Sequence, residues 1–329
     1  MAHTYRHDTL AIRSEALRGN PLGDPFERTL HVLVPEKADG PLPVIWILGG
    51  YSATPGSVLA DEPWSEGLQR RLGRLSAEGT LPPVIVAVPD CFTALGGSQY
   101  LDSAAVGRYE SYLWDDCRVA LEARYSCGKH GVAGKSSGGF GALVQAMRRP
   151  EHVRAVACHS GDMYFEYCYL ASFPALANAL RKHGGVEGFL AAFAAARKKR
   201  KQEWFDPIQT LCMAACYSPD PAQAGGIALP FDPETAAIRL DVWSRWLAHD
   251  PVRMVDEPAN AERLRGLDLL FLDAGTRDEF HLQWGLRQLV AKLRAQGISH
   301  EHEEFEDGHF STSYRYDVSL PKLARALRE

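Results

Sequence analysis

The stretch GKHGVAGKSSGGFGAL, residues 128–143, joins a short apolar strand pattern directly to a helical pattern. Two motifs overlap in it. Gly134, Lys135 and Ser136 look like the end of a phosphate-binding loop, and residues 134–138 also fit the pattern G-x-S-x-G. The first motif indicates a nucleotide-binding protein, and the second indicates a reactive serine on a tight turn between a strand and a helix.

The spacing around this stretch does not suit a phosphate-binding loop. The motif G-x-x-x-x-G-K-[ST] needs its first glycine at position 129, where the chain has Lys129, and Gly128 lies one residue too early. The preceding segment, CRVALEARYS, has a helical pattern, whereas a phosphate-binding loop follows a strand. We therefore keep a nucleotide-binding protein as the alternative from another functional class.

The serine motif fits its surroundings in each part. The strand pattern HGVAG ends at Gly134, and the helical pattern begins directly after Ser136. Glycines two residues before and two residues after the serine leave room for the backbone to cross at a sharp turn. We therefore predict Ser136 as a nucleophile that lies at the positive end of a helix dipole.

Strand and helix patterns alternate along most of the chain. Such alternation predicts an α/β fold with a mostly parallel central sheet and helices on both faces. The first two strand patterns, near 8–16 and 27–35, have no helix between them, so we expect an antiparallel pair at one edge. The later strand patterns cover 43–48, 83–89, 130–134, 153–160, 267–275 and 300–306, and helical patterns cover 66–79, 109–125, 139–149 and 279–297.

The alternation breaks between residues 162 and 250, where helical patches and a Gly/Pro-rich loop occur without a convincing strand. Helices inserted between late strands of a sheet often form a lid over the active site. We therefore predict a core in two parts, residues 1–161 and 251–329, separated by a helical lid insertion at 162–250.

A nucleophilic serine needs a base, and the base needs an orienting carboxylate. In α/β hydrolases the acid and then the histidine follow the serine in the chain. Asp278 follows the next-to-last strand pattern, and His309 follows the last one. Because the carboxyl ends of parallel strands meet at one edge of a sheet, we predict Asp278 as the acid and His309 as the base. Glu279 and Asp162 are the alternative acids.

The developing negative charge on the substrate oxygen needs hydrogen-bond donors. One donor should be the backbone N–H of Ser137, the residue after the nucleophile, and the other should come from the loop after an early strand. The segment ILGGYS supplies such a loop, in which two glycines allow a sharp turn and expose the N–H of Tyr51.

The aromatic run MYFEYCY, residues 163–169, begins just beyond a predicted strand end. Its side chains, Tyr164, Phe165 and Tyr167 among them, either line the mouth of the site and favour aromatic or hydrophobic esters, or pack inside the lid. Ser98 and Gln99, in the loop between residues 93 and 109, are further candidates for contact with the substrate.

Composition limits the partners and cofactors of this chain. A formal net charge of −5 argues against a general nucleic-acid binder. No apolar run approaches the ~20 residues of a membrane span, and the first residues lack the apolar core of a signal peptide, so we expect a cytoplasmic protein. The seven cysteines include no C-x-x-C pair, so we expect reduced thiols and no metal site. An apolar lid surface would suit a homodimer.

Several of these segments resemble the esterase D and enterochelin esterase-like family of α/β hydrolases. The resemblance covers most of the chain outside the insertion and rests on LGGYS, GGSQYLDSAAVGRYESYLWDD, AGKSSGGFGAL, DAGTRDEF and EDGHF. That family includes enterochelin esterases, S-formylglutathione hydrolases, feruloyl and acetylxylan esterases and mycolyl transferases. The resemblance implies the α/β-hydrolase fold, a triad of Ser136, Asp278 and His309, and oxyanion donors near Tyr51 and at Ser137.

The sequence therefore predicts a serine carboxylic ester hydrolase that works through an acyl-enzyme and needs no cofactor. Its predicted substrates are small or aromatic and hydrophobic esters, siderophore-type esters among them. An acyltransferase and a thioesterase like S-formylglutathione hydrolase are the alternatives within this class. The insertion is longer than in small relatives, which leaves the natural substrate open.

Overall fold

The computed structural model describes residues 4–37, 40–199 and 201–328, with an eight-stranded sheet at its centre. The strand order is β1-β2-β4-β3-β7-β8-β9-β10, and the six strands from β4 to β10 in this order run parallel to one another. The strands are β1 Tyr5–Arg13, β2 Glu27–Pro35, β3 Leu42–Leu48, β4 Ile85–Pro89, β7 Cys127–Lys135, β8 Ala155–His159, β9 Leu269–Gly275 and β10 Glu301–Phe305.

The antiparallel pair at one edge of the sheet is confirmed. β1 pairs with β2 along its whole length, and β2 pairs antiparallel with β4. β1 begins at Tyr5, three residues before the predicted start, because its outer face is polar and the apolar pattern alone does not mark its beginning.

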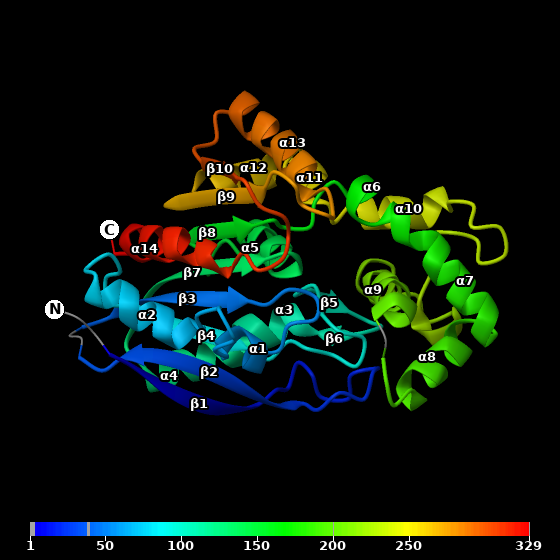
Figure 1. Cartoon of the computed structure of the whole chain (residues 1–329), viewed down its shortest axis with the longest axis horizontal. Helices are drawn as coiled ribbons and strands as arrows, with labels where there is room; N and C mark the ends of the chain where they lie inside the picture. Colours follow the sequence, from blue (N-terminus) through cyan, green and yellow to red (C-terminus); the bar gives the residue numbers. More distant parts are fainter. Residues whose placement is uncertain (1–3, 38–39, 200, 329) are drawn as a thin grey trace.

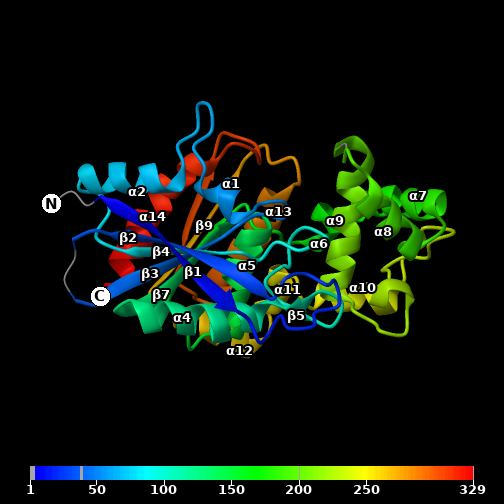
Figure 2. The ribbon, with the colours of Figure 1, turned by 90° about the horizontal axis from the view of Figure 1, so that it is seen from below.

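Helices cover both faces of the sheet (Figure 2). In β3, Ile45 and Ile47 point to a cluster shared with helices α2 and α14, whereas Trp46 points to the opposite cluster. This division follows from the alternation of side chains along a strand. One face carries α2 (Leu68–Ala77) and α14 (Tyr316–Ala326), and the other carries α4 (Arg118–Arg124), α5 (Ser137–Arg148), α12 (Pro258–Arg265) and α13 (Leu282–Ala295).

The helix predicted over 109–125 is divided into three parts. A short α3 (Tyr109–Ser111) leads into a π-helical turn, η1 (Tyr112–Cys117), and then into α4. Tyr112, Leu113 and Trp114 in this turn are all fully buried. The preceding loop also forms a small two-stranded sheet from β5 (Asp102–Ser103) and β6 (Gly107–Arg108), which the sequence pattern did not reveal.

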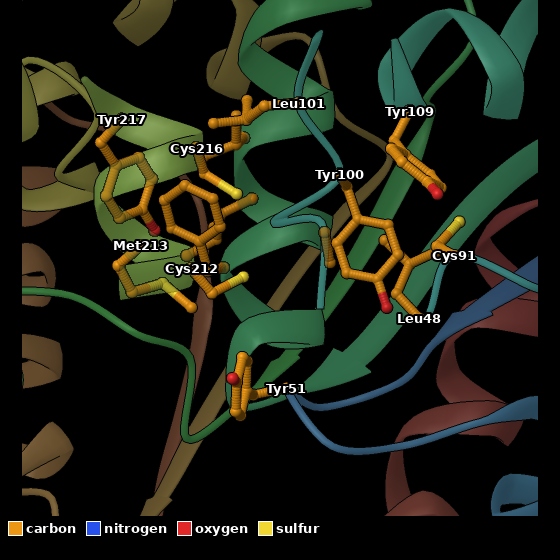
Figure 3. Packing of buried hydrophobic residues seen from close by; sticks show 14 of the residues in the cluster. Leu48, Tyr51, Cys91, Tyr100, Leu101, Tyr109, Cys212, Met213, Cys216 and Tyr217 are labelled. Atoms are coloured by element: carbon orange, nitrogen blue, oxygen red, sulfur yellow. The ribbon is translucent and has the colours of Figure 1, made fainter. Parts of the chain in front are cut away.

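Between β8 and β9 the chain leaves the sheet and forms a group of helices beyond the carboxyl ends of the parallel strands (Figure 1). Its apolar side chains continue one core cluster from the sheet. In Figure 3, Cys212, Met213 and Cys216 of α9 lie beside Tyr51 and the loop that carries Tyr100. The elements are α6 Phe165–Cys168, η2 Leu170–Ser172, α7 Phe173–His183, α8 Val186–Ala195, α9 Lys201–Tyr217, η3 Ala224–Gly226, α10 Leu240–Leu247 and α11 Pro251–Met254.

A short helix, α1 (Pro55–Leu59), follows the loop after β3.

Within the residues described, no helix is both long enough and apolar enough to cross a bilayer.

Candidate active site

Ser136 occupies a strained turn between β7 and α5. Its backbone has φ 58° and ψ −127°, a conformation that a non-glycine residue adopts only when its surroundings enforce it. Its N–H donates a hydrogen bond to the carbonyl of His159 in the neighbouring strand (3.0 Å). A Cβ on Gly134 would lie 2.2 Å from the carbonyl oxygen of Gly138, and a Cβ on Gly138 would lie 2.0 Å from that of Leu48. Close backbone packing therefore requires both glycines of G-x-S-x-G.

The same segment does not form a phosphate-binding loop. Residues 127–135 are a strand, β7, hydrogen-bonded on both sides to β3 and β8. Their amides are consequently used in the sheet and do not form the loop that a Walker motif provides.

Asp278 and His309 form a buried acid–base pair. The His309 Nδ1 and the Asp278 Oδ2 lie 2.8 Å apart, and the two side chains are almost inaccessible to solvent. The other oxygen of this carboxylate accepts the backbone N–H of Phe280 (2.9 Å). With Nδ1 carrying the proton toward Asp278, the Nε2 of His309 is the free acceptor, as a general base requires.

The two alternative acids have different partners. Glu279 accepts the backbone N–H of His309 through Oε2 (2.6 Å), so it holds the main chain of the histidine rather than its ring. Asp162 lies beside the serine: its Oδ1 is 3.4 Å from Ser136 Oγ, and its Oδ2 accepts the hydroxyl of Ser137 (2.9 Å). Only Asp278 contacts the imidazole among the carboxylates of the described residues.

The pKa of the buried Asp162 carboxyl is raised overall. Burial raises the pKa of the Asp162 carboxyl, while hydrogen bonds from Tyr169 and Ser137 and the positive charge of His309 act in the opposite direction. No hydrogen bond joins His309 to Ser136 in the described part of the chain, and the Ser136 hydroxyl is directed to Asp162 instead. Among the described residues, the Asp278–His309 pair is therefore formed, but no hydrogen bond links it to Ser136.

Lys135, the last residue of β7, directly precedes Ser136. Burial lowers the pKa of Lys135, and the negative charges of Asp278, Glu279 and Asp307 oppose this shift. These three carboxylates thus favour the protonated form of the lysine.

The backbone amides of Ser137 and Tyr51 belong to two segments that lie next to Ser136. Ser137 is the first residue of α5, so its N–H has no carbonyl partner within the helix. The N–H of Tyr51 makes no hydrogen bond to another backbone group among the described residues. A Cβ on the preceding Gly50 would lie 3.6 Å from the Cβ of Ser136, which places the Tyr51 loop against the nucleophile.

Side chains fix this loop. The Tyr51 hydroxyl donates to the carbonyl of Leu95 (2.5 Å), and the Tyr100 hydroxyl donates to that of Gly49 (2.6 Å). Both rings are visible in Figure 3 on either side of the loop after β3. Because these bonds tie the glycine turn to a second loop, the Tyr51 amide is held in place before any substrate arrives.

The residues predicted to contact substrate divide into buried and accessible ones. Gln99 is fully buried, with its Nε2 2.7 Å from the Tyr217 hydroxyl and 3.4 Å from Asp162, and Ser98 is buried beside it. Phe165 is also fully buried, against Phe140, Tyr169 and Tyr217.

Tyr164 and Tyr167 are the more accessible members of the aromatic run. Their rings meet edge to face at 4.7 Å, and Tyr167 is half exposed. Tyr167 lines an open groove of about 710 Å³ between α6 and α13, whose other wall includes His281, Trp284 and Arg287. The aromatic run thus contributes both to packing and to an accessible surface.

A second Ser-His-Asp arrangement lies behind the turn of Ser136, and the sequence analysis missed it. The His159 Nδ1 is 2.7 Å from Asp273 Oδ1, and its Nε2 is 2.8 Å from the Ser319 hydroxyl. All three side chains are buried, and Ser319 is wholly inaccessible, so no substrate can reach this serine. No local motif signals the arrangement, because Ser319 comes from α14, 160 residues after His159.

This buried arrangement connects the loops of the candidate site. Asp273 also accepts a hydrogen bond from Arg315 (2.7 Å), which lies six residues after His309. The backbone carbonyl of His159, as noted, accepts the N–H of Ser136. Asp273 therefore ties the loop of the histidine to the strand that supports the serine.

Replacing Asp273 with Asn is expected to destabilise the fold by about 3 kcal/mol, because it removes the fully buried negative charge that both Arg315 and His159 contact. Urea unfolding measures the change. Glu303→Gln is the matched control, because Glu303 pairs with the same Arg315 but its side chain is 39% exposed. We expect less than about 1 kcal/mol there. Equal losses in the two variants would contradict the role given to Asp273.

Within the described residues, no group of three His, Cys, Asp or Glu side chains is arranged to hold a metal ion. All seven cysteines have free thiols.

The chain matches one protein-family model over residues 25–325, and that family is described as "Putative esterase". None of the curated protein sequences matches it significantly. Among solved structures it is similar to a ferulic acid esterase (17% identity, 98% of each chain covered, TM-score 0.62). It is also similar to an S-formylglutathione hydrolase from Agrobacterium tumefaciens (18% identity, 99% of this chain and 97% of that chain, TM-score 0.61).

A third similar structure is the fluorophosphonate-binding serine hydrolase F of Staphylococcus aureus (14% identity, 99% of each chain covered, TM-score 0.58). At these identities the structural likeness establishes the fold, and the family model establishes the relationship. The chain therefore belongs to the "Putative esterase" family of α/β hydrolases, the family that its motifs resemble.

Proposed function

We propose that the protein is a serine-dependent carboxylic ester hydrolase that acts through an acyl-enzyme. The observation that carries this proposal is that the strained Ser136 turn and the buried pair of Asp278 and His309 follow β7, β9 and β10, whose carboxyl ends lie at one edge of the sheet. Membership of the esterase family and the unpaired amides of Tyr51 and Ser137 support the same chemistry.

In the proposed reaction, Ser136 Oγ attacks the ester carbonyl carbon while the Nε2 of His309 takes its proton. Asp278 stabilises the imidazolium that forms. The substrate oxygen becomes negative and is held by the amides of Tyr51 and Ser137. The alcohol leaves with the proton from His309, and a water molecule then releases the acyl group by the same route.

The helical insertion, residues 162–250, is proposed to act as a lid over this site. It begins at Asp162, next to the nucleophile, and places Tyr169 and Tyr217 over the Gln99 loop. In this proposal residues 1–161 and 251–329 form the hydrolase core, and the lid together with the 93–109 loop shapes the acyl and alcohol pockets.

Thioester hydrolysis is a second candidate activity. It uses the same acyl-enzyme, and the similarity in fold to S-formylglutathione hydrolases favours it over chemistry of another class. Acyl transfer differs only in that an alcohol replaces water in the last step.

A substrate panel tests this proposal. p-Nitrophenyl esters of increasing acyl length, an aryl ester such as a feruloyl ester, a siderophore-type ester and an S-acyl glutathione are compared by kcat/KM. Turnover of at least one oxygen ester, equal with and without a metal chelator, supports a serine esterase. Turnover of thioesters alone would replace it with the second candidate, and turnover of none of them would contradict both.

A further inference from the structure

Asp162 is a buried carboxylate in direct contact with the nucleophile, and the proposed mechanism gives it no part. It is 5% exposed, and its backbone N–H donates to the carbonyl of Ser136 (3.3 Å). A carboxylate at this distance from a reacting serine lies beside any acyl group that becomes attached to that serine.

The two oxygens of Asp162 have unequal hydrogen bonding. Oδ2 accepts the hydroxyls of Ser137 and Tyr169, both at 2.9 Å, and faces the Gln99 amide at 3.4 Å. Oδ1 has a single long contact, the Ser136 hydroxyl at 3.4 Å, among the residues described. An ionised carboxylate oxygen can accept two hydrogen bonds, so Oδ1 has acceptor capacity that the protein does not use.

The reaction removes even this one donor. When Ser136 attacks, its proton passes to His309, and the Oγ then carries the acyl group and no hydrogen. Asp162 Oδ1 is thereby left without a donor inside the protein, and a buried polar atom without a partner is costly. A hydrogen-bond donor on the substrate would remove that cost in the acyl-enzyme and in the transition states on either side of it.

A second buried acceptor in the same cluster also lacks a partner. The Oε1 of Gln99 has no hydrogen bond in the structure, although the residue is fully buried. Its Nε2 is held by Tyr217 and faces Asp162, so Oε1 is left over. One unsatisfied acceptor beside a carboxylate oxygen with a single long hydrogen bond is unusual in a folded interior and is consistent with a ligand that brings donors.

We infer that Asp162 selects acyl groups that carry a hydroxyl or N–H on the carbon next to the ester carbonyl. The inference rests on the proposed function, because it needs the acyl group on Ser136. In such an acyl-enzyme the donor atom is three bonds from Oγ, roughly 2.7–3.6 Å away by ordinary covalent geometry. Oδ1 lies 3.4 Å from the same Oγ, so a rotation of the acyl group that turns the donor toward Asp162 brings it within hydrogen-bonding distance of Oδ1.

The substrate class follows from the charge of this group. 2-Hydroxyacyl and 2-acylamino esters provide the donor, whereas a methoxy group at the same position provides only an acceptor and a methyl group provides neither. A carboxylate there would meet the negative charge of Asp162 and would be rejected.

The experiment compares three methyl esters of nearly equal size: 2-hydroxypropanoate, 2-methoxypropanoate and 2-methylpropanoate. For the wild type, kcat/KM is expected to be about 10- to 100-fold higher for the hydroxy ester than for the other two, the range of a hydrogen bond to a charged group. The hydroxy and methoxy esters carry the same electron-withdrawing oxygen next to the carbonyl, so the ratio between these two largely cancels differences in intrinsic ester reactivity.

Asp162→Asn is expected to lower the ratio of kcat/KM for the hydroxy ester to kcat/KM for the methoxy ester by at least about tenfold. The new carbonyl oxygen should stay opposite the Gln99 N–H, so the NH₂ group should face the acyl carbon and favour the methoxy ester. Tyr217→Phe is the control, since it removes a hydroxyl one contact away from Asp162 and should keep the hydroxy preference. Asp162→Ala, which removes both oxygens, should bring the ratio close to one.

The outcomes separate this inference from the proposed function. Equal kcat/KM for the three esters in the wild type would overturn the inference and leave the esterase proposal standing. A hydroxy preference that persists in Asp162→Asn or Asp162→Ala would also overturn it, because the donor would then be recognised elsewhere. No turnover of any ester, with no covalent labelling of Ser136, would overturn both. If neither variant folds, the absence of a preference for the hydroxy ester over the methoxy ester in the wild type still overturns the inference.

Discussion

Replacing Ser136 with Ala is expected to lower kcat by about 10⁴- to 10⁶-fold, because the variant has no oxygen to attack the carbonyl. The fold should survive, since the change removes one oxygen that makes only a long hydrogen bond. Initial rates on the best ester of the panel, with circular dichroism to verify folding, measure the effect.

His309→Ala should cost a similar factor, and the double variant should cost little more than either single one. The serine and histidine act as a unit, so removal of either one removes the same attack. Folded single variants with near-wild-type rates would refute the assignment, and so would losses that multiply in the double variant.

Asp278→Asn should produce the second large loss, of about 10⁴-fold in kcat. The geometry explains why. An amide NH₂ opposite Nδ1 would favour the histidine tautomer whose Nε2 carries the proton, and that nitrogen could no longer accept one from Ser136. The loss should be seen with every ester, since it concerns the base and not the acyl pocket.

Glu279→Gln is the matched control for this change. Glu279 is the neighbouring acid, but it holds the backbone N–H of His309, a bond that a glutamine oxygen can also accept. We therefore expect a loss at least 100-fold smaller than that of Asp278→Asn. If Asp162→Asn abolished turnover of all esters while Asp278→Asn did not, the orienting acid would lie on the earlier strand.

Much of the fold was predictable because local patterns determine it. The strands β3, β4 and β7 are short and largely apolar, so both of their faces must be buried. A parallel sheet that is covered by helices on both sides provides that burial. Once the sheet is parallel, the ends of its strands meet at one edge, and this brings the Ser136 turn, the Asp278 loop and the His309 loop together. The strand ends and the chain order were sufficient to predict that Asp278 and His309 lie in contact, whereas the triad with Ser136 stays a prediction.

The partners of the buried polar groups could not be predicted in this way. Asp162 and Asp273 both follow or end strand patterns and look alike in the sequence. Packing distinguishes them: Asp162 meets Ser137 and Tyr169, while Asp273 meets His159 and Arg315. These contacts depend on how the insertion and α14 pack against the sheet. The spacing of residues within a short segment does not predict that packing.

The burial of individual side chains in the aromatic run, residues 163–169, could not be predicted from the sequence either. Sequence position left pocket lining and lid packing equally open for Tyr164, Phe165 and Tyr167. The turn at Tyr164, where φ is 54°, and the short helix after it bury Phe165 and leave Tyr167 half exposed. Helical spacing could suggest that neighbours differ, but the buried face is decided by Phe140 and Tyr217 from distant elements.

The most direct test of the proposed chemistry is covalent labelling with a phosphonate probe, followed by mass spectrometry. Cleavage after Lys135 and Arg148 gives a peptide of residues 136–148 that holds both Ser136 and Ser137, so fragment ions must assign the site. The account predicts one added phosphonyl group per chain, on Ser136, with loss of esterase activity in proportion and no labelling in Ser136→Ala. A phosphonyl group on Ser137 or elsewhere, or full esterase activity in a chain labelled at Ser136, would contradict it.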